Sequence, residues 1–148
     1  MAPHAALAAH QSLMRDHIAP VLHERGYVGT SLFRRHLPTG WHLLTFHGSH
    51  SAASGLARVT FDFAAITDAA WEERRAWSAE HTPAVKLPKL PSATWADPER
   101  IGEARTGIDQ WYEYKPTADL AALSARILKD LDRYATPYME KRVPSKAK

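Results

Sequence analysis

The sequence predicts an α+β fold in which an antiparallel sheet of about four strands carries the N-terminal and C-terminal helices packed on one face. Apolar residues recur at helical spacing near both ends of the chain, over residues 7–22 and 120–134. Between these segments, residues 57–63 alternate apolar with polar side chains, which is typical of a strand with one wet face. Short runs at 31–36 and 41–47 flank a turn sequence and indicate a β-hairpin.

The chain has 148 residues and is expected to form a single α+β domain over residues 1–140, followed by a basic flexible tail over 141–148. Cysteine is absent, which excludes disulfides, thiolate nucleophiles and cysteine-ligated metals. The first residues lack the pattern of a signal peptide, and no apolar run reaches the roughly 18 residues of a membrane-spanning helix. We therefore expect a cytoplasmic location and no membrane contact.

The N-terminal apolar stripe predicts a helix that ends near Arg25. Pro20 lies inside this span and predicts either two helical pieces or one bent helix. Gly26 can adopt the left-handed conformation that follows a helix cap, and Tyr27 can then pack back on Leu22 as in a Schellman ending. The helix should therefore stop at this glycine.

After the alternating strand, Thr67 or Asp68 can cap a helix that runs to about Glu80. The next stretch has few periodic apolar residues and several prolines, which predicts a long irregular connection. These prolines are Pro83, Pro88, Pro91 and Pro98.

The last part of the chain is expected to contain a strand within residues 108–115 and then the C-terminal helix. Thr117 is the predicted N-cap of this helix, and Pro137 is predicted to end it.

Several short motifs occur in a fixed order along the chain. They are Gly26-Tyr27, Phe33-Arg34-Arg35, Leu44–Ser49, Val59–Phe63, Arg100-Ile-Gly102 and Asp109–Tyr112. Over about residues 16–138 this order resembles the bacterial family called Domain of Unknown Function 4304, with His47 where the family usually has glutamine and Tyr112 where it often has tryptophan. The resemblance implies an α+β fold and a bacterial cytoplasmic setting, and it carries over no activity and no catalytic residue.

Polar and aromatic side chains are predicted to gather on the sheet face away from the helices. These candidate binding residues are Arg58, Thr60, Asp62, Trp111, Glu113 and His47. A carboxylate pair beside a cation and an aromatic ring can bind a partner or a polar ligand, or perform acid–base chemistry if burial raises one pKa. A solvated sheet face has the same alternation. Leu43 and Leu44 point to opposite faces of the second strand, so the sequence does not decide which of its faces is buried.

Aromatic residues flank the proline-rich connection and can line a cleft beneath it or anchor it to the core. They are Trp95, Trp111, Tyr112 and Tyr114.

The nine histidines do not form a predicted metal site. His42 and His47 are five residues apart on one strand and therefore face opposite sides, with no carboxylate close in sequence. We expect no metal and no cofactor.

The formal charge of +3 and the pairs Arg34-Arg35 and Arg74-Arg75 allow a phosphate-binding strip. Glu72 and Glu73 precede the second pair and favour local ion pairs instead. Nucleic-acid binding is not expected, because no nucleic-acid-binding signature supports it.

Together these features favour a small non-catalytic binding module that contacts a protein partner, as a regulator or an immunity-type inhibitor. The alternative is a cofactor-independent enzyme or small-ligand-binding protein that uses the same sheet face. A weaker alternative is a protein that binds the nucleic-acid backbone.

Overall fold

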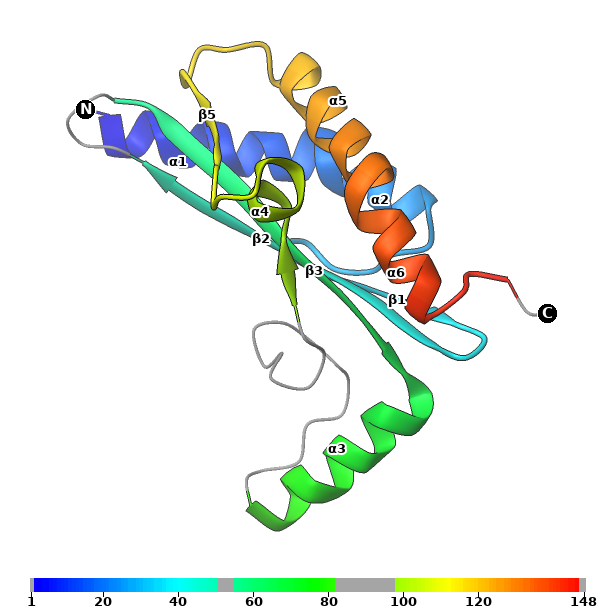
Figure 1. Ribbon diagram of the computed structural model, residues 1–148. Helices are drawn as coiled ribbons and strands as arrows, with labels where there is room; N and C mark the ends of the chain where they lie inside the picture. The colour runs from blue at the N-terminus through cyan, green and yellow to red at the C-terminus, as the bar shows by residue number, and fades with distance from the viewer. Residues whose placement is uncertain (1, 51–54, 82–97, 147–148) are drawn as a thin grey trace.

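The fold is organised around the antiparallel sheet of the computed structural model in Figure 1. The structure describes residues 2–50, 55–81 and 98–146. The sheet has five strands, which are β1 (Leu32–Leu37), β2 (Gly40–His50), β3 (Ala57–Thr67), β4 (Glu99–Arg100) and β5 (Tyr112–Tyr114). Strands β1, β2 and β3 are consecutive neighbours, and both β4 and β5 pair with the other edge of β3. The predicted α+β class with an antiparallel sheet is confirmed.

Two long helical segments cover one face of this sheet (Figure 1). The N-terminal segment consists of α1 (Ala2–Ser12), the π-helical η1 (Leu13–Ile18) and α2 (Ala19–Glu24). The C-terminal segment consists of α5 (Leu120–Asp130), the π-helical η3 (Leu131–Ala135) and α6 (Thr136–Arg142). The short α4 (Ile101–Thr106) also adds a buried Ile101 to the core on this side. No helix in the described part of the chain is long and apolar enough to cross a membrane.

Strand β3 is buried on both faces because its alternate residues enter two different hydrophobic clusters. Val59, Phe61 and Phe63 belong to the main core beneath the helices. Ala64 and Ile66 lie on the opposite face of β3 and belong to a second hydrophobic cluster. Its other members are Leu43 of β2 and Trp71 of α3 (Asp68–His81). Leu44 lies in the main core and Leu43 in the second cluster, so both faces of β2 are covered.

The predicted ends of the first and third helices are confirmed in atomic detail. The N–H of Tyr27 donates to the carbonyl of Leu22 at 2.9 Å and Gly26 adopts a φ of 93°, as a Schellman ending requires. At the start of α3, the hydroxyl of Thr67 accepts from the N–H of Ala70 at 3.1 Å.

Pro137 does not end the C-terminal helix, contrary to the sequence prediction. The chain passes through the π-helical turn η3 immediately before it, and the N–H of Thr136 donates to the carbonyl of Leu131, five residues back. This wider turn places the proline in the first turn of α6, where a missing N–H costs little. Pro20 follows η1 in the same way, in the first turn of α2. The N-terminal segment has helical backbone at both junctions, so the predicted alternative of two separate helical pieces is not found.

Other local predictions for the second half need correction. Asp119, not Thr117, caps α5, because its carboxylate accepts from the N–H of Ala122 at 3.1 Å. The predicted strand over 108–115 is limited to β5, and the sequence patterns missed β4 and α4. The greater part of the predicted irregular connection, with Pro83, Pro88, Pro91 and Trp95, lies outside the described residues.

The predicted flexible tail does not begin at residue 141. Helix α6 continues through Arg142, and the Val143 side chain is 0% exposed within the main core. The N–H of Ser145 donates to the Glu140 carboxylate at 2.8 Å. Val143 thus packs the end of the chain against the β1–β2 hairpin. A Cβ at Gly40 of this hairpin would lie only 3.0 Å from Cγ2 of Val143, so the glycine makes this contact possible.

Replacing Val143 with alanine should lower the free energy of unfolding by about 2 kcal/mol, because the change removes two buried methyl groups and leaves a cavity. Urea denaturation measures this loss. The control Lys146→Ala, at an exposed position of the same tail, should change stability by less than about 0.5 kcal/mol. Equal stability of the two variants would show that Val143 is not packed.

His42 is a buried histidine on the helical side of β2. Its Nε2 donates to the carbonyl of Val143 at 2.6 Å, and its Nδ1 accepts from Arg35 at 2.9 Å. A carbonyl only accepts and a guanidinium only donates, so both bonds require the neutral ring with its proton on Nε2. Burial lowers the pKa of His42 from its ordinary value of 6.5, although the hydrogen bond to Val143 opposes this shift.

The free energy of unfolding should therefore fall as the pH drops below about 6.5. In this range His42 is protonated in the unfolded chain but stays neutral in the folded protein. The slope for one such group is at most about 1.4 kcal/mol per pH unit. His10, whose pKa is also lowered by burial, adds to it with the same sign. Unfolding curves from about pH 7.5 to 5.5 should show a weaker dependence in His42→Gln than in the wild type. The exposed control His50→Gln should keep the wild-type dependence, and an unchanged slope in His42→Gln would contradict this account.

Candidate functional site

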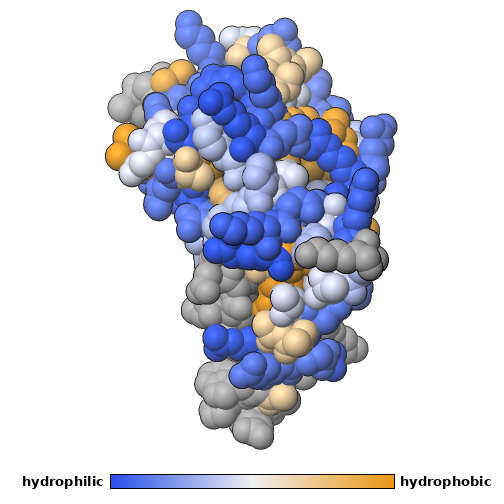
Figure 2. All heavy atoms as spheres, turned by 45° about the vertical axis from the view of Figure 1, so that its right-hand side comes forward, coloured by the Kyte–Doolittle hydropathy of each residue, from blue (hydrophilic) through white to orange (hydrophobic). Residues whose placement is uncertain are grey.

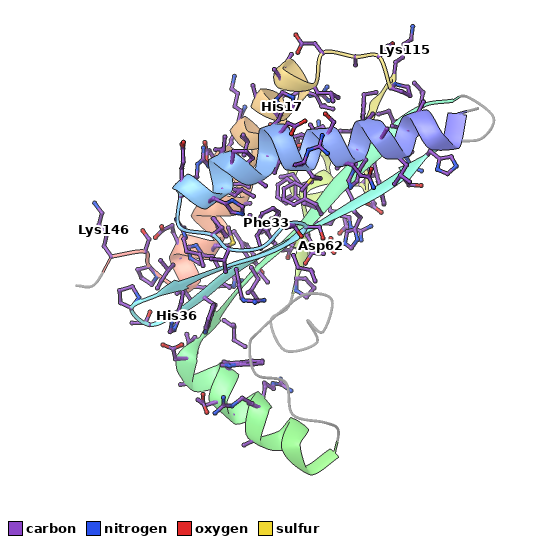
Figure 3. All side chains as sticks on the ribbon, turned by 180° about the vertical axis from the view of Figure 1, so that it is seen from behind. His17, Phe33, His36, Asp62, Lys115 and Lys146 are labelled. Atoms are coloured by element: carbon purple, nitrogen blue, oxygen red, sulfur yellow. The ribbon has the colours of Figure 1, made fainter. Side chains whose placement is uncertain are left out.

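The sheet face opposite the helices, called the outer face below, carries the residues that the sequence singled out. Cross-strand register places them opposite one another: Arg58 faces Glu113, His47 faces Thr60, and Asp62 faces Arg100 of β4. Directly opposed residues share a face, so these side chains project to one side. Asp62, labelled in Figure 3, lies near the middle of the long strand β3.

Asp62 is the centre of an ion-pair network on this face. One carboxylate oxygen contacts Nε2 of His47 at 2.9 Å, and the other accepts from Nε of Arg100 at 2.7 Å. Arg100 also donates to Asp109 at 3.0 Å. The Asp62 side chain is 13% exposed, and its hydrogen bond raises the pKa of Arg100 despite partial burial of the guanidinium. Both oxygens of Asp62 are thus engaged, which fixes the His47 ring and the Arg100 guanidinium around it.

Trp111 lies beside this network and contacts both arginines of the outer face. The guanidinium carbon of Arg58 is 4.7 Å from the centre of a Trp111 ring, and that of Arg100 is 5.6 Å away. Both distances are within the range of cation–π attraction. The tryptophan is only partly buried, so the cluster of Arg58, Arg100 and Trp111 reaches solvent.

The neighbouring Tyr112 anchors Trp111 from the other side of the sheet. Alternate residues of a strand point to opposite faces, and the Tyr112 ring is buried in the main core. Its hydroxyl donates to Asp130 of α5 at 2.7 Å, and burial together with this hydrogen bond raises the pKa of Tyr112. The guanidiniums of Arg105 and Arg126 contact the same ring. Strand β5 is therefore held firmly while it presents Trp111.

The expectation that β3 has one wet face is wrong at Thr60. Its side chain is 0% exposed, and the Oγ1 atom is buried with no hydrogen-bond partner among the described residues. Thr45 on the adjacent strand is also buried. Glu113 is exposed and takes part in none of the ion pairs of the described residues, so Asp109 supplies the second carboxylate of the network. The structure joins Arg58, Asp62, His47 and Trp111 but not the whole predicted set.

Sequence reasoning did not identify Arg100 or Asp109 as site residues. Gly102 brings them together, because a Cβ at this position would lie 2.4 Å from the carbonyl oxygen of Gln110. The close approach of the two backbones folds α4 back and sets Asp109 beside Arg100. The glycine two residues after Arg100 was the available signal, but its partner, Gln110, is revealed only by the fold.

The outer face carries side-chain charges of both signs. Arg58 and Arg100 are accompanied by the carboxylates of Asp62, Asp109 and Glu113, so the face offers both charges. Asp62 orients His47 as the carboxylate orients the base in a catalytic dyad, but the hydroxyl of the facing Thr60 is buried. Within the described part of the chain, no group of three or more His, Asp or Glu residues is arranged to hold a metal ion.

Comparison with family models, curated proteins and solved structures found no match to this chain. The resemblance to Domain of Unknown Function 4304 therefore stays a prediction.

Replacing Asp62 with asparagine should lower the free energy of unfolding by about 2 kcal/mol, because two hydrogen bonds to a charged, sheltered carboxylate are weakened. Chemical denaturation measures the loss. The matched control Glu113→Gln removes an exposed charge of the same face and should cost less than about 0.5 kcal/mol. A free energy of unfolding equal to that of the wild type in Asp62→Asn would refute the central role of this carboxylate.

Proposed function

We propose that this protein is a small non-catalytic binding module that contacts a protein partner through the outer face. The observation that carries the proposal is the partly exposed Trp111 held against two arginines by cation–π contacts. Tryptophan and arginine are the side chains most enriched among residues that dominate binding energy at protein interfaces. Arg58, Arg100 and Trp111 are therefore the proposed anchors of the contact.

The anchors are preorganised before any partner arrives. Arg100 is held by Asp62 and Asp109, and Tyr112 fixes the strand that carries Trp111. Side chains that are already ordered lose less conformational entropy on binding. This rigidity supports a recognition role for the cluster.

A polar surface of mixed charge supports a protein partner better than a nucleic acid. The carboxylates of Asp62, Asp109 and Glu113 stand among the arginines and would repel a phosphate backbone. In the view of Figure 2, hydrophilic residues cover most of the surface and hydrophobic residues form small separate groups. Among the described residues, the exposed large hydrophobic side chains are Leu7, Val28, Leu32 and Ile108. Recognition would then rely on the polar and aromatic anchors rather than on a broad apolar patch.

The proposed setting is the bacterial cytoplasm, where the protein would act as a regulator or as an immunity-type inhibitor. The absence of cysteine fits a reducing compartment. The resemblance described above points to the same setting.

A second candidate function is supported by the His47–Asp62 pair. The carboxylate holds the imidazole at 2.9 Å and leaves Nδ1 of His47 for a ligand, which suits a small-ligand-binding protein or a cofactor-independent acid–base enzyme. Native mass spectrometry after gentle purification separates this alternative from the first, because it would reveal a small molecule rather than a protein in stoichiometric amount.

Trp111→Ala and Arg58→Glu should each weaken partner binding by at least about tenfold, since interface anchors of these types contribute about 2 kcal/mol or more. Affinity capture of the partner from the source cytoplasm, after nuclease treatment, followed by titration of the purified pair, measures this loss.

The control for this experiment is Lys129→Glu, which reverses an exposed charge on α5, away from the outer face. It should bind as the wild type does, and far-ultraviolet circular dichroism should show that all variants are folded. Unaltered binding by both Trp111→Ala and Arg58→Glu would reject the outer face as the contact surface.

A further inference from the structure

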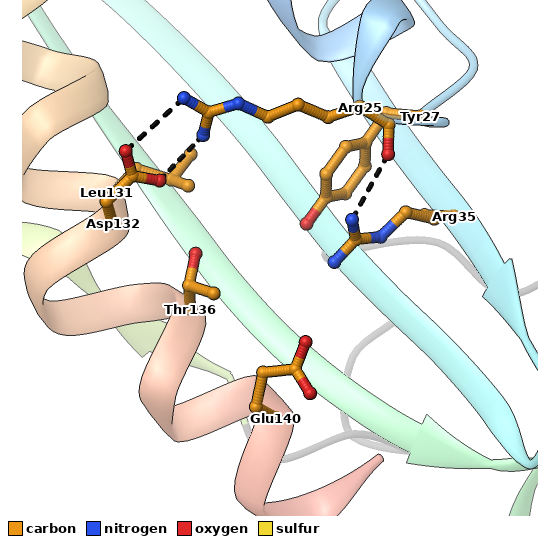
Figure 4. A pocket seen from close by; sticks show the side chains of 7 residues that line it. All are labelled: Arg25, Tyr27, Arg35, Leu131, Asp132, Thr136 and Glu140. Carbon is orange, nitrogen blue, oxygen red and sulfur yellow. Dashed lines mark hydrogen bonds and ion pairs between the residues drawn. The ribbon is translucent and has the colours of Figure 1, made fainter. Parts of the chain in front are cut away.

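A small polar cavity lies between β1 and the C-terminal helical segment, on the helical side of the sheet (Figure 4). Its volume is about 230 Å³, which is below the range of drug-sized ligand sites and suits a molecule of few heavy atoms. The polar residues that line it are Arg25, Tyr27, Arg35, Asp132, Thr136 and Glu140. All of them belong to the described chain, and none takes part in the outer-face cluster.

Arg35 brings to this cavity a positive charge that forms no ion pair within the described part of the chain. Its guanidinium donates to the carbonyl of Arg25 at 3.1 Å and to the neutral ring of His42, and it lies 4.7 Å from the centre of the Tyr27 ring. None of these partners is a carboxylate, and Arg35 takes part in none of the ion pairs of the described residues. Its Nε is buried without a hydrogen-bond partner. The guanidinium is thus fixed in place with its charge still available to an anion.

Glu140 brings to the cavity a negative charge that likewise forms no ion pair within the described part of the chain. One carboxylate oxygen accepts from the N–H of Ser145 at 2.8 Å, and the residue forms none of the ion pairs of the described chain. Partial burial opposes its ionisation, but the Ser145 hydrogen bonds and the positive charge of Arg35 lower the pKa of Glu140. The carboxylate is therefore ionised at neutral pH, and Figure 4 shows it across the cavity from Arg35.

The other charges and hydroxyls complete a polar lining. Arg25 and Asp132 neutralise each other through two contacts of 2.7 and 3.3 Å, so this pair adds little net field. Tyr27 and Thr136 also line the cavity and bring a hydroxyl each (Figure 4). Burial raises the pKa of Tyr27 to about 12, so its hydroxyl keeps its proton and can donate a hydrogen bond.

We propose that this cavity binds a free amino acid, or a similar small zwitterion, with its carboxylate on Arg35 and its ammonium group on Glu140. A guanidinium recognises a carboxylate with paired donors, and a carboxylate recognises an ammonium group in the same charge-assisted way. A simple anion or cation would satisfy only one wall and leave the other charge unpaired.

The test is a titration of ¹⁵N-labelled protein with glycine and L-serine, followed through the backbone amide signals of residues 132–140. Acetate and methylamine serve as matched probes, because each carries one of the two charged groups of glycine. Glycine should give saturable shifts of these signals and bind at least about tenfold more tightly than either probe, since it adds a second charge-assisted contact.

Glu140→Gln should remove this preference and leave glycine no tighter than acetate. Its amide oxygen still accepts from Ser145, so the variant should remain folded, and an unchanged spectrum elsewhere verifies this. Glu113→Gln, on the outer face, should bind glycine as the wild type does. The proposal is overturned if neither amino acid gives saturable shifts, if acetate or methylamine matches glycine, or if Glu140→Gln leaves the affinity unchanged.

Discussion

Strand β3 is paired along both edges and buried on both faces, and the other elements take their positions from it. Its eleven residues pair in continuous register with β2 on one edge, while β4 and β5 share the other edge. The faces differ in content, because Val59, Phe61 and Phe63 meet the helices, whereas Ala64 and Ile66 meet the second cluster. A slip by one residue would exchange these two sets, so the register is strongly specified.

The shared edge of β3 also explains the outer-face cluster. Strand β4 ends opposite Asp62 and so delivers Arg100 to that carboxylate, while β5 begins opposite Val59 and delivers Trp111 beside Arg58. The connection between β4 and β5 folds tightly because Gly102 lets two backbones approach. Two short strands that would be unstable alone are thus held by one long strand and by the Tyr112–Asp130 hydrogen bond.

Features with a local cause were predictable from the sequence, and those with a tertiary cause were not. The alternation of apolar and polar residues in β3 and the glycine at residue 26 determine the conformation of the adjacent backbone. The strand and the Schellman ending were therefore predicted correctly. Pro137 was misread because the π-helical turn that accommodates it has no local signature. In the site, alternation placed Arg58 and Asp62 on one face, but the burial of Thr60 depends on contacts that no spacing reveals.

In the proposed function the two sides of the sheet differ in role, with partner recognition on the outer face and a small polar cavity beneath the helices. The most direct measurement is hydrogen–deuterium exchange of the protein alone and in complex with its purified partner. The account predicts that slowed exchange is concentrated in β5 and the adjoining part of β3, where Trp111 and Arg58 lie. Slowed exchange confined to the N-terminal and C-terminal helices, with β5 unchanged, would contradict it.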